Sequence, residues 1–246
     1  MSKIIKTLFL LIIICGTVLF SVAEIQARTD NRNYFNTNLR RPFDRSQILR
    51  NIFSLHSYGD ARADYLGSKY KNILIEAQLP EDQTADPNLL TAVGNKISEI
   101  TGKNTTYLID PALNMDSGIS SAEIGVARNF YKYGNTADTA VIHLTLLGVE
   151  TDQPNVIGDT LMENGMVIFI GSIQAISSGS TGVAYAYELG TILHEFGHQL
   201  GLEHNDLPDC LMNPRAEVGG QPAAFPGQIA TDFCPAEIQQ INNMAY

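Results

Sequence analysis

Cysteine and histidine are both scarce in this chain, which has three cysteines and five histidines among 246 residues. One cysteine, Cys15, lies in an apolar N-terminal run, so only Cys210 and Cys234 remain for the folded part. Two thiolates are too few for a cysteine-only zinc site. No Ser/His/Asp or cysteine-nucleophile arrangement is recognisable either, because every clear catalytic pattern falls in one histidine-containing segment.

Positive charge is also scarce, and it is unevenly distributed. The chain has 16 Lys+Arg against 26 Asp+Glu, a formal net charge of −10. Residues 24–71 carry nine basic and five acidic residues, whereas residues 72–246 carry five basic and 21 acidic residues. So acidic a main segment excludes nucleic acid as the expected partner.

The N-terminus has the pattern of a secretory signal peptide. Lys3 and Lys6 precede an apolar run from Leu8 to Val22, which is short for a membrane span, and small residues follow. We expect residues 1–23 to be removed after Ala23, with Ala27 as a second possible site and an uncleaved anchor as the alternative. The mature protein is then secreted or periplasmic and has no stable membrane span.

The remaining chain divides at about residue 72. Residues 24–71 form a basic arm, which is either a solvated linker or a propeptide docked on the acidic domain. Residues 72–246 are enough for a single hydrophobic core, and we expect a monomer. Strand-like and helix-like patterns alternate there, which predicts an α/β (α+β) domain with a mixed sheet.

The expected elements of this domain follow from periodicity and capping residues. Predicted strands are 72–79, 105–109, 140–147 and 166–170. Predicted helices are 86–102, 120–133, a long helix capped by residues 177–181, and a terminal helix from Pro235 with Ile238 and Ile241 on its inner face.

The long helix ends in the most informative stretch, His194 to His204, which reads HExxHxxGxxH. His194 and His198 are four residues apart, so a helix presents both imidazoles on one face to a shared metal ion. Glu195 can reach a metal-bound water without ligating the metal. Gly201 can end the helix, and His204 then returns as a third ligand.

Three imidazoles leave one tetrahedral position of zinc open for water, which is typical of a catalytic site. The competing interpretation is an amphipathic helix whose histidines are ordinary core or surface groups. The three motif positions disfavour it here, but it is our interpretation of His143, which lies in an apolar run.

The same motif is the signature of the metzincin zinc peptidases, which this chain resembles. Metzincins place a methionine turn beneath the metal, and Met212 in the Cys-Leu-Met-Asn-Pro segment is similar to that methionine. The resemblance implies an upper subdomain containing the sheet and a lower one formed by residues 202–246. It also implies an edge strand between residues 156 and 170 that binds substrate, and a pocket wall at residues 213–232.

Within this clan, the spacing of Cys210, Met212 and Cys234 resembles that of archaemetzincins, although adamalysin-like members also have a Cys-x-Met turn. Archaemetzincins bind a second zinc with four cysteines, and here Asn205 and Glu237 replace two of them. We therefore expect one zinc. In an oxidising compartment Cys210 and Cys234 would form a disulfide, and the alternative is two free buried thiols.

These observations predict a secreted zinc endopeptidase that acts on proteins or peptides, with Glu195 as general base. Two alternatives stay open. One is a zinc hydrolase of cell-wall peptide or another non-protein amide, and the other is a binding module that retains zinc without turnover.

Overall fold

The protein is described by a computed structural model that divides the chain into two compact units, Met1–Ser57 and Tyr58–Tyr246. The described residues are 3–27, 34–39, 43, 49, 58–80, 84–113, 118–119, 133–150, 155–162, 164–214 and 229–244. The second unit starts before residue 72, where the sequence analysis expected the domain to begin. Tyr65 on the short helix α4 (Arg62–Leu66) and Ala61 directly before that helix are buried in its core.

The first unit contains helix α1 (Lys3–Ala27) and a π-helical turn, η1 (Phe35–Leu39). Phe35 is fully buried and meets the ring of Phe43 edge-on, with 5.3 Å between ring centroids. Within the described ranges, no helix has the length and apolar character needed to cross a membrane. The expected signal peptide and its cleavage stay predictions, and in the basic arm residues 28–33, 40–42, 44–48 and 50–57 fall outside the described residues.

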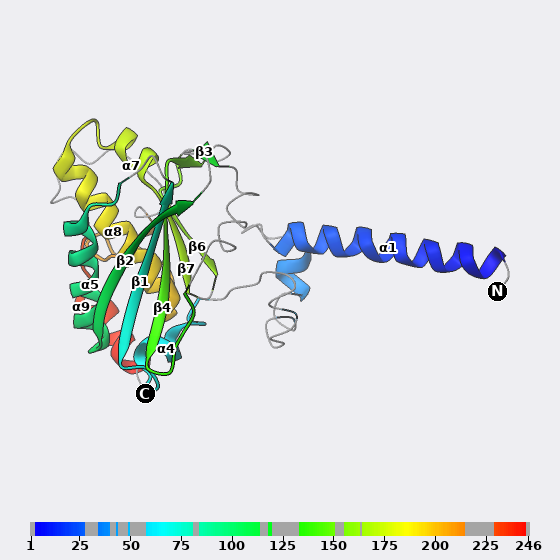
Figure 1. The fold of residues 1–246 in the computed structure, drawn as a ribbon, viewed down its shortest axis with the longest axis horizontal. Helices are drawn as coiled ribbons and strands as arrows, with labels where there is room; N and C mark the ends of the chain where they lie inside the picture. The colour runs from blue at the N-terminus through cyan, green and yellow to red at the C-terminus, as the bar shows by residue number, and fades with distance from the viewer. Residues whose placement is uncertain are drawn as a thin grey trace. The chain divides into compact units, whose positions relative to one another are not determined.

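The second unit is built on a mixed five-stranded sheet with the strand order β2-β1-β4-β7-β6 (Figure 1). The strands are β1 (Asn72–Pro80), β2 (Asn104–Leu113), β4 (Thr139–Leu147), β6 (Gly158–Met162) and β7 (Gly165–Phe169). All neighbours are parallel except β6, which pairs antiparallel with β7 and forms one edge. The α/β fold class, the four predicted strands and the edge strand between residues 156 and 170 are confirmed.

Two short strands, β3 (Gly118–Ile119) and β5 (Val149–Glu150), pair in parallel apart from the main sheet. Helix α5 (Pro87–Thr101) covers one face of the sheet and begins and ends as predicted. The Asp86 side chain accepts a hydrogen bond from the Asn88 amide, and Gly102 closes the helix with a φ of 67°. The core between sheet and helices receives every second residue of β1: Ile73, Ile75, Ala77 and Leu79.

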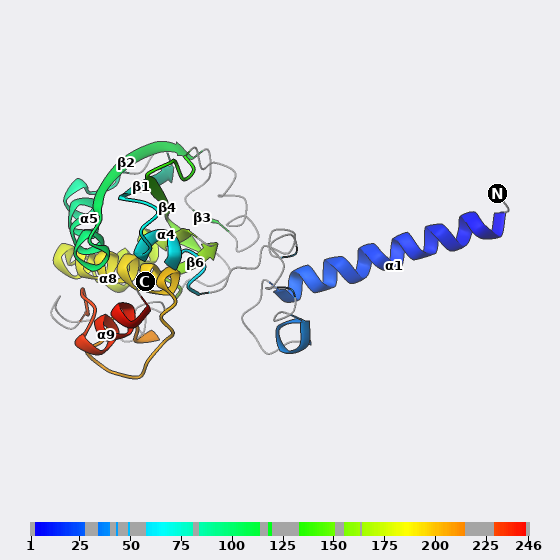
Figure 2. The same ribbon diagram turned by 90° about the horizontal axis from the view of Figure 1, so that it is seen from below.

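Helix α8 (Thr181–Leu200) follows the shorter α7 (Ile170–Ile176). Ser180 caps its start, within the polar segment that predicted the cap, and Gly201 ends it in the left-handed region with a φ of 97°. Figure 2 shows α8 between the sheet and the C-terminal helix α9 (Pro235–Met244), which gives the expected upper and lower parts.

One expectation about α9 is wrong. Ile241 is buried as predicted, but Ile238 is 37% exposed. Glu237 and Ile241 are four residues apart and share the inner face, so Ile238, about 100° further around the helix, points outward. Two other expectations lie largely outside the described residues: the helix at 120–133, of which only the last residue is described, and the pocket wall, of which residues 215–228 are not.

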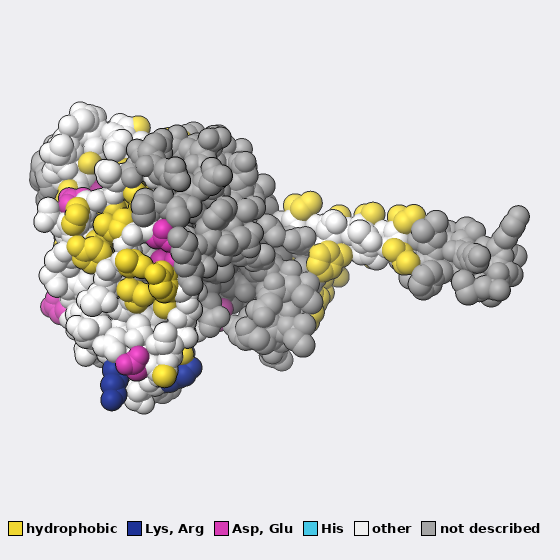
Figure 3. Space-filling model, in the orientation of Figure 1, with side chains coloured by type: hydrophobic (Ala, Val, Ile, Leu, Met, Phe, Trp, Pro, Cys, Tyr) yellow, Lys and Arg dark blue, Asp and Glu magenta, His cyan; other side chains and the backbone are white. Residues whose placement is uncertain are grey.

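The surface of the described residues agrees with the acidic composition of this segment. In the view of Figure 3, Lys and Arg side chains of the second unit lie at its lower end next to an acidic side chain, and further acidic side chains lie above them.

Candidate metal centre

The last turns of α8 place the motif in the interior of the second unit. His194, Glu195 and His198 are fully buried. Gly197 lets the helix approach the turn below it, because a Cβ there would lie 2.4 Å from the Met212 sulfur. After Gly201 the chain leaves the helix axis, so that the exposed residue His204 can return toward the other two histidines.

The three imidazoles converge on one point. The Nε2 atom of His204 lies 3.2 Å from Nε2 of His194 and 3.1 Å from Nε2 of His198. On the far side of the rings, His194 Nδ1 lies 2.7 Å from the Leu211 carbonyl and His198 Nδ1 lies 2.9 Å from the Leu202 carbonyl. A carbonyl only accepts hydrogen bonds, so both Nδ1 atoms donate. In the neutral rings, Nε2 then directs a lone pair to the shared point.

These residues fit a zinc ion. Zinc binds imidazole nitrogen at about 2.0–2.1 Å, so two nitrogens of a tetrahedral site lie about 3.4 Å apart. The distances of 3.1 and 3.2 Å between the Nε2 atoms are close to that value. Nitrogen lone pairs at this separation repel one another unless a metal ion or a proton lies between them. Carbonyl acceptors on the outer nitrogens are also the usual way in which zinc-binding histidines are oriented.

Glu195 lies between this cluster and the edge strand β6. Its Oε2 accepts a hydrogen bond of 2.6 Å from the Thr160 hydroxyl. Gly158 brings the backbone of β6 against α8, since a Cβ there would lie 2.4 Å from Thr191 Cγ2 and 3.1 Å from Glu195 Oε1. Thr160 is a site residue that the sequence analysis missed. The predicted edge strand was the one clue to it, and no local motif marks its hydroxyl.

Tyr58 is a second residue that the sequence analysis missed. Its ring stacks on the His198 imidazole, with 3.9 Å between centroids and an angle of 13°. The next amide, that of Gly59, donates to the His198 carbonyl at 2.9 Å, and Gly59 packs backbone to backbone against Gly201. The segment that begins at Tyr58 therefore belongs to the wall of the histidine cluster.

The turn that follows the histidines contains Met212 and the predicted disulfide. Met212 is fully buried beside Gly197, and its role as the floor of a metal site stays a prediction. Cys210 and Cys234 form a disulfide with an S–S distance of 2.04 Å, so the alternative of two free thiols is wrong for this structure. Cys15 is the one free cysteine of the described residues, and it is exposed on α1.

His143 lies apart from this cluster, as expected. It is buried on β4, and its Nδ1 is 2.8 Å from a carboxylate oxygen of Glu76 on β1. Burial lowers the pKa of His143, and the neighbouring Glu76 carboxylate opposes that shift. His143 is thus a satisfied core group and offers no ligand to the histidine cluster.

No protein-family model matches the sequence, and no curated protein matches it either. Several solved structures resemble the fold. An archaemetzincin from Archaeoglobus fulgidus is 14% identical, with a TM-score of 0.44 over 68% of this chain and 99% of its own. A zinc-dependent peptidase from Methanocorpusculum labreanum is 15% identical, with a TM-score of 0.46 over 68% of this chain and 100% of its own.

A further archaemetzincin, from Methanopyrus kandleri, is 12% identical, with a TM-score of 0.47 over 72% of this chain and 96% of its own. Sequence identities and TM-scores as low as these describe a similarity in the shape of the fold and carry no argument about function. The function proposed next therefore depends on the atoms of the site.

Proposed function

We propose that this chain is a zinc-dependent endopeptidase of the metzincin type. The observation that carries the proposal is the convergence of three imidazole Nε2 atoms next to a buried carboxylate. His194, His198 and His204 hold one zinc ion, and Met212 forms the floor beneath them. When bound, zinc polarises the scissile carbonyl and lowers the pKa of a water molecule.

The residues of the chain perform the proton transfers and the positioning. Glu195 accepts the proton of the attacking water and delivers it to the leaving amide nitrogen. The Thr160 hydroxyl holds the carboxylate of Glu195 beside the histidines. Strand β6 is an edge of the sheet and packs on Glu195, so an extended peptide paired with this edge would pass directly over the site.

The proposed compartment is outside the cytoplasm, either secreted or periplasmic. The disulfide supports it, since disulfides persist in oxidising compartments, and so does the signal-like N-terminus. In this proposal residues 1–23 are removed on export. The part of the basic arm before Tyr58 is then a linker or a propeptide, because the segment from Tyr58 onward is built into the site.

The test is hydrolysis of casein by the purified protein with and without a chelator, compared with a Glu195→Gln variant. We expect the variant to bind zinc normally and to lose about 10²–10⁴-fold in rate, because only the proton acceptor is removed. Near-normal hydrolysis by Glu195→Gln would remove this residue from the mechanism.

The same assay separates the alternative functions. Cleavage of cell-wall peptide without cleavage of casein would indicate the non-protein amide hydrolase. Zinc binding with neither activity would indicate a binding module.

A further inference from the structure

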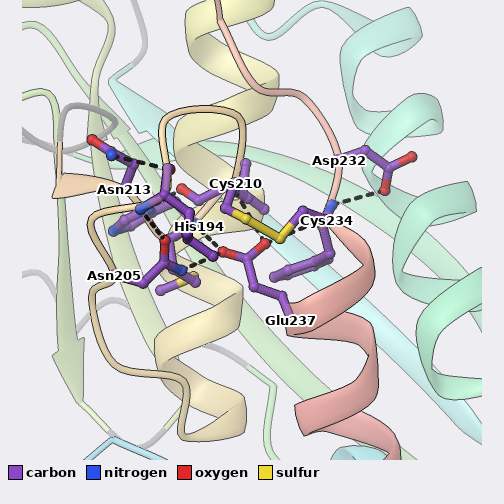
Figure 4. Close-up of a disulfide and its surroundings, with 11 residues drawn as sticks. His194, Asn205, Cys210, Asn213, Asp232, Cys234 and Glu237 are labelled. Carbon is purple, nitrogen blue, oxygen red and sulfur yellow. Dashed lines mark hydrogen bonds between the residues drawn. A yellow bond between two sulfur atoms is a disulfide. The ribbon is translucent and has the colours of Figure 1, made fainter.

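Glu237, in the first turn of α9, is a buried carboxylate to which no role has yet been assigned. Glu237 is 1% exposed, and Figure 4 shows its carboxylate directed toward Asn205 and the disulfide between Cys210 and Cys234. Four N–H groups donate to it: Met212 N at 2.8 Å and Asn205 Nδ2 at 2.8 Å to Oε1, and Cys234 N at 2.9 Å and Leu211 N at 3.1 Å to Oε2.

The chemistry of these contacts calls for a carboxylate. Each oxygen accepts two hydrogen bonds, and none of the four partners can accept one. A carboxamide would direct its NH₂ group at two N–H donors. No Lys or Arg of the described residues forms an ion pair with Glu237. A buried carboxylate whose hydrogen bonds come from these four N–H groups holds the groups in position. Moving any one of them would weaken a hydrogen bond that the buried oxygen cannot replace with water.

The donors belong to the segments that carry the histidine cluster. Leu211 donates its amide to Glu237 and accepts the Nδ1 proton of His194 on its carbonyl at 2.7 Å. Asn205 directly follows His204, and the backbone N–H of Asn205 donates to the Met212 carbonyl at 2.9 Å. One carboxylate therefore connects to two of the three histidines through one intervening residue each.

We propose that Glu237 is a positioning residue of the metal centre, a proposal that rests on the zinc site proposed above. Its carboxylate fixes the Leu211 carbonyl that orients His194, and it fixes the residue that follows His204. The adjacent disulfide has a different effect. It ties Cys210 to Cys234 through a covalent bond between their sulfur atoms, whereas Glu237 sets the orientation of the backbone amides of Leu211 and Met212.

The test is zinc affinity in the full chain, measured by chelator competition, together with the visible spectrum of Co²⁺ bound in place of zinc. Glu237→Gln keeps the size of the side chain, but its NH₂ group would face two N–H groups that now donate to a carboxylate oxygen. We expect about 10- to 100-fold weaker zinc binding and a changed Co²⁺ spectrum, the usual effect of losing a group that orients metal ligands.

The matched control is Ile241→Ala, one turn further along the same buried face of α9. It removes apolar packing of the helix but none of the four hydrogen bonds that Glu237 accepts. We expect it to lower the melting temperature while leaving zinc affinity and the Co²⁺ spectrum unchanged. An equal loss of zinc affinity in Ile241→Ala would show that Glu237 acts only by holding α9 in place, and would overturn the proposal.

Asn205→Ala gives a second measurement, because it removes the branch from Glu237 to His204 and leaves the three backbone donors of Glu237 in place; it also removes the hydrogen bond from the Leu207 amide to Asn205 Oδ1. We expect a smaller loss of zinc affinity than in Glu237→Gln. If Glu237→Gln fails to fold, normal affinity in Asn205→Ala overturns the proposal. If the wild-type chain binds zinc and cleaves casein, and Glu237→Gln has the same zinc affinity and Co²⁺ spectrum, only the positioning role fails. If the wild-type chain does not bind zinc, the proposed function fails and this role with it.

Discussion

The disulfide between Cys210 and Cys234 should contribute a measurable part of the stability of the second unit. The two cysteines are 24 residues apart. For a loop of this length the chain-entropy model gives a stabilisation of about 3.5 kcal/mol, through the lower entropy of the unfolded chain. In a domain of about 150–250 residues, 1 kcal/mol shifts the melting temperature by about 2–4 °C, so reduction should lower it by about 7–14 °C.

Reduction should leave the histidine cluster chemically intact. Neither cysteine contributes to it, and the outer nitrogens of His194 and His198 are held by backbone carbonyls. The methionine turn next to Cys210 should nevertheless loosen when the covalent constraint is lost. We therefore expect zinc to remain bound at moderate temperature while peptidase activity falls earlier on heating.

The assay is thermal unfolding of the exported protein by circular dichroism, with and without a phosphine reductant that binds zinc weakly. A Cys210→Ala/Cys234→Ala variant is the control, and it should melt at the temperature of the reduced wild type with no response to reductant. Mass spectrometry of the non-reduced protein should find the two cysteines in one linked peptide pair.

Three results would refute this reasoning. Alkylation of both cysteines as free thiols in the exported protein would show that the bond does not form there. A melting temperature that falls equally in the double variant on adding reductant would show that the reductant acts elsewhere. An unchanged melting temperature in fully reduced wild type would mean that the loop is already constrained in the unfolded chain.

Three further outcomes are expected. Gly197→Ala should displace Met212, whose sulfur would lie 2.4 Å from the new Cβ, and should lower zinc retention, whereas Gly94→Ala on α5, with 3.8 Å to its nearest neighbour, should retain zinc normally. Burial, assisted by Asp86, raises the pKa of Glu188 to about 7, so its contribution to stability falls as pH rises from about 4.5 to about 7. Glu188→Gln should therefore raise the melting temperature at pH 8 and not at pH 4, and equal shifts at both would contradict this. Elemental analysis should find one zinc per chain, and two tightly bound zinc ions would show that a second site survives.

The ends of α5 and α8 were predictable because their determinants are local. Asp86 and Ser180 cap helices through hydrogen bonds to amides two or three residues away, and Gly102 and Gly201 end them in the left-handed region. The spacing of the motif histidines is likewise a property of one helix and one turn. The pairing of Cys210 with Cys234 followed from a count of cysteines and from the family resemblance.

Other site residues were not predictable because their contacts are distant in sequence. Tyr58 lies in a segment that composition assigns to the basic arm, yet its ring stacks on His198. Thr160 has no pattern that marks its hydroxyl as the partner of Glu195. The prediction for Ile238 failed because apolar spacing on a short helix did not reveal that the inner face belongs to the carboxylate of Glu237.

The sequence by itself determined the candidate ligand set, the candidate base and the alternation of strands and helices, since these depend on side-chain chemistry and on periodicity over a few residues. Only the tertiary structure decided which backbone carbonyls orient the imidazoles, which hydroxyl holds Glu195 and which carboxylate organises the turn beneath them. The physical reason is that a buried polar group must find its partners among whatever groups the packed chain brings within about 3 Å. That set of neighbours depends on how sheet, α8 and α9 pack together, and no local pattern in the sequence records it.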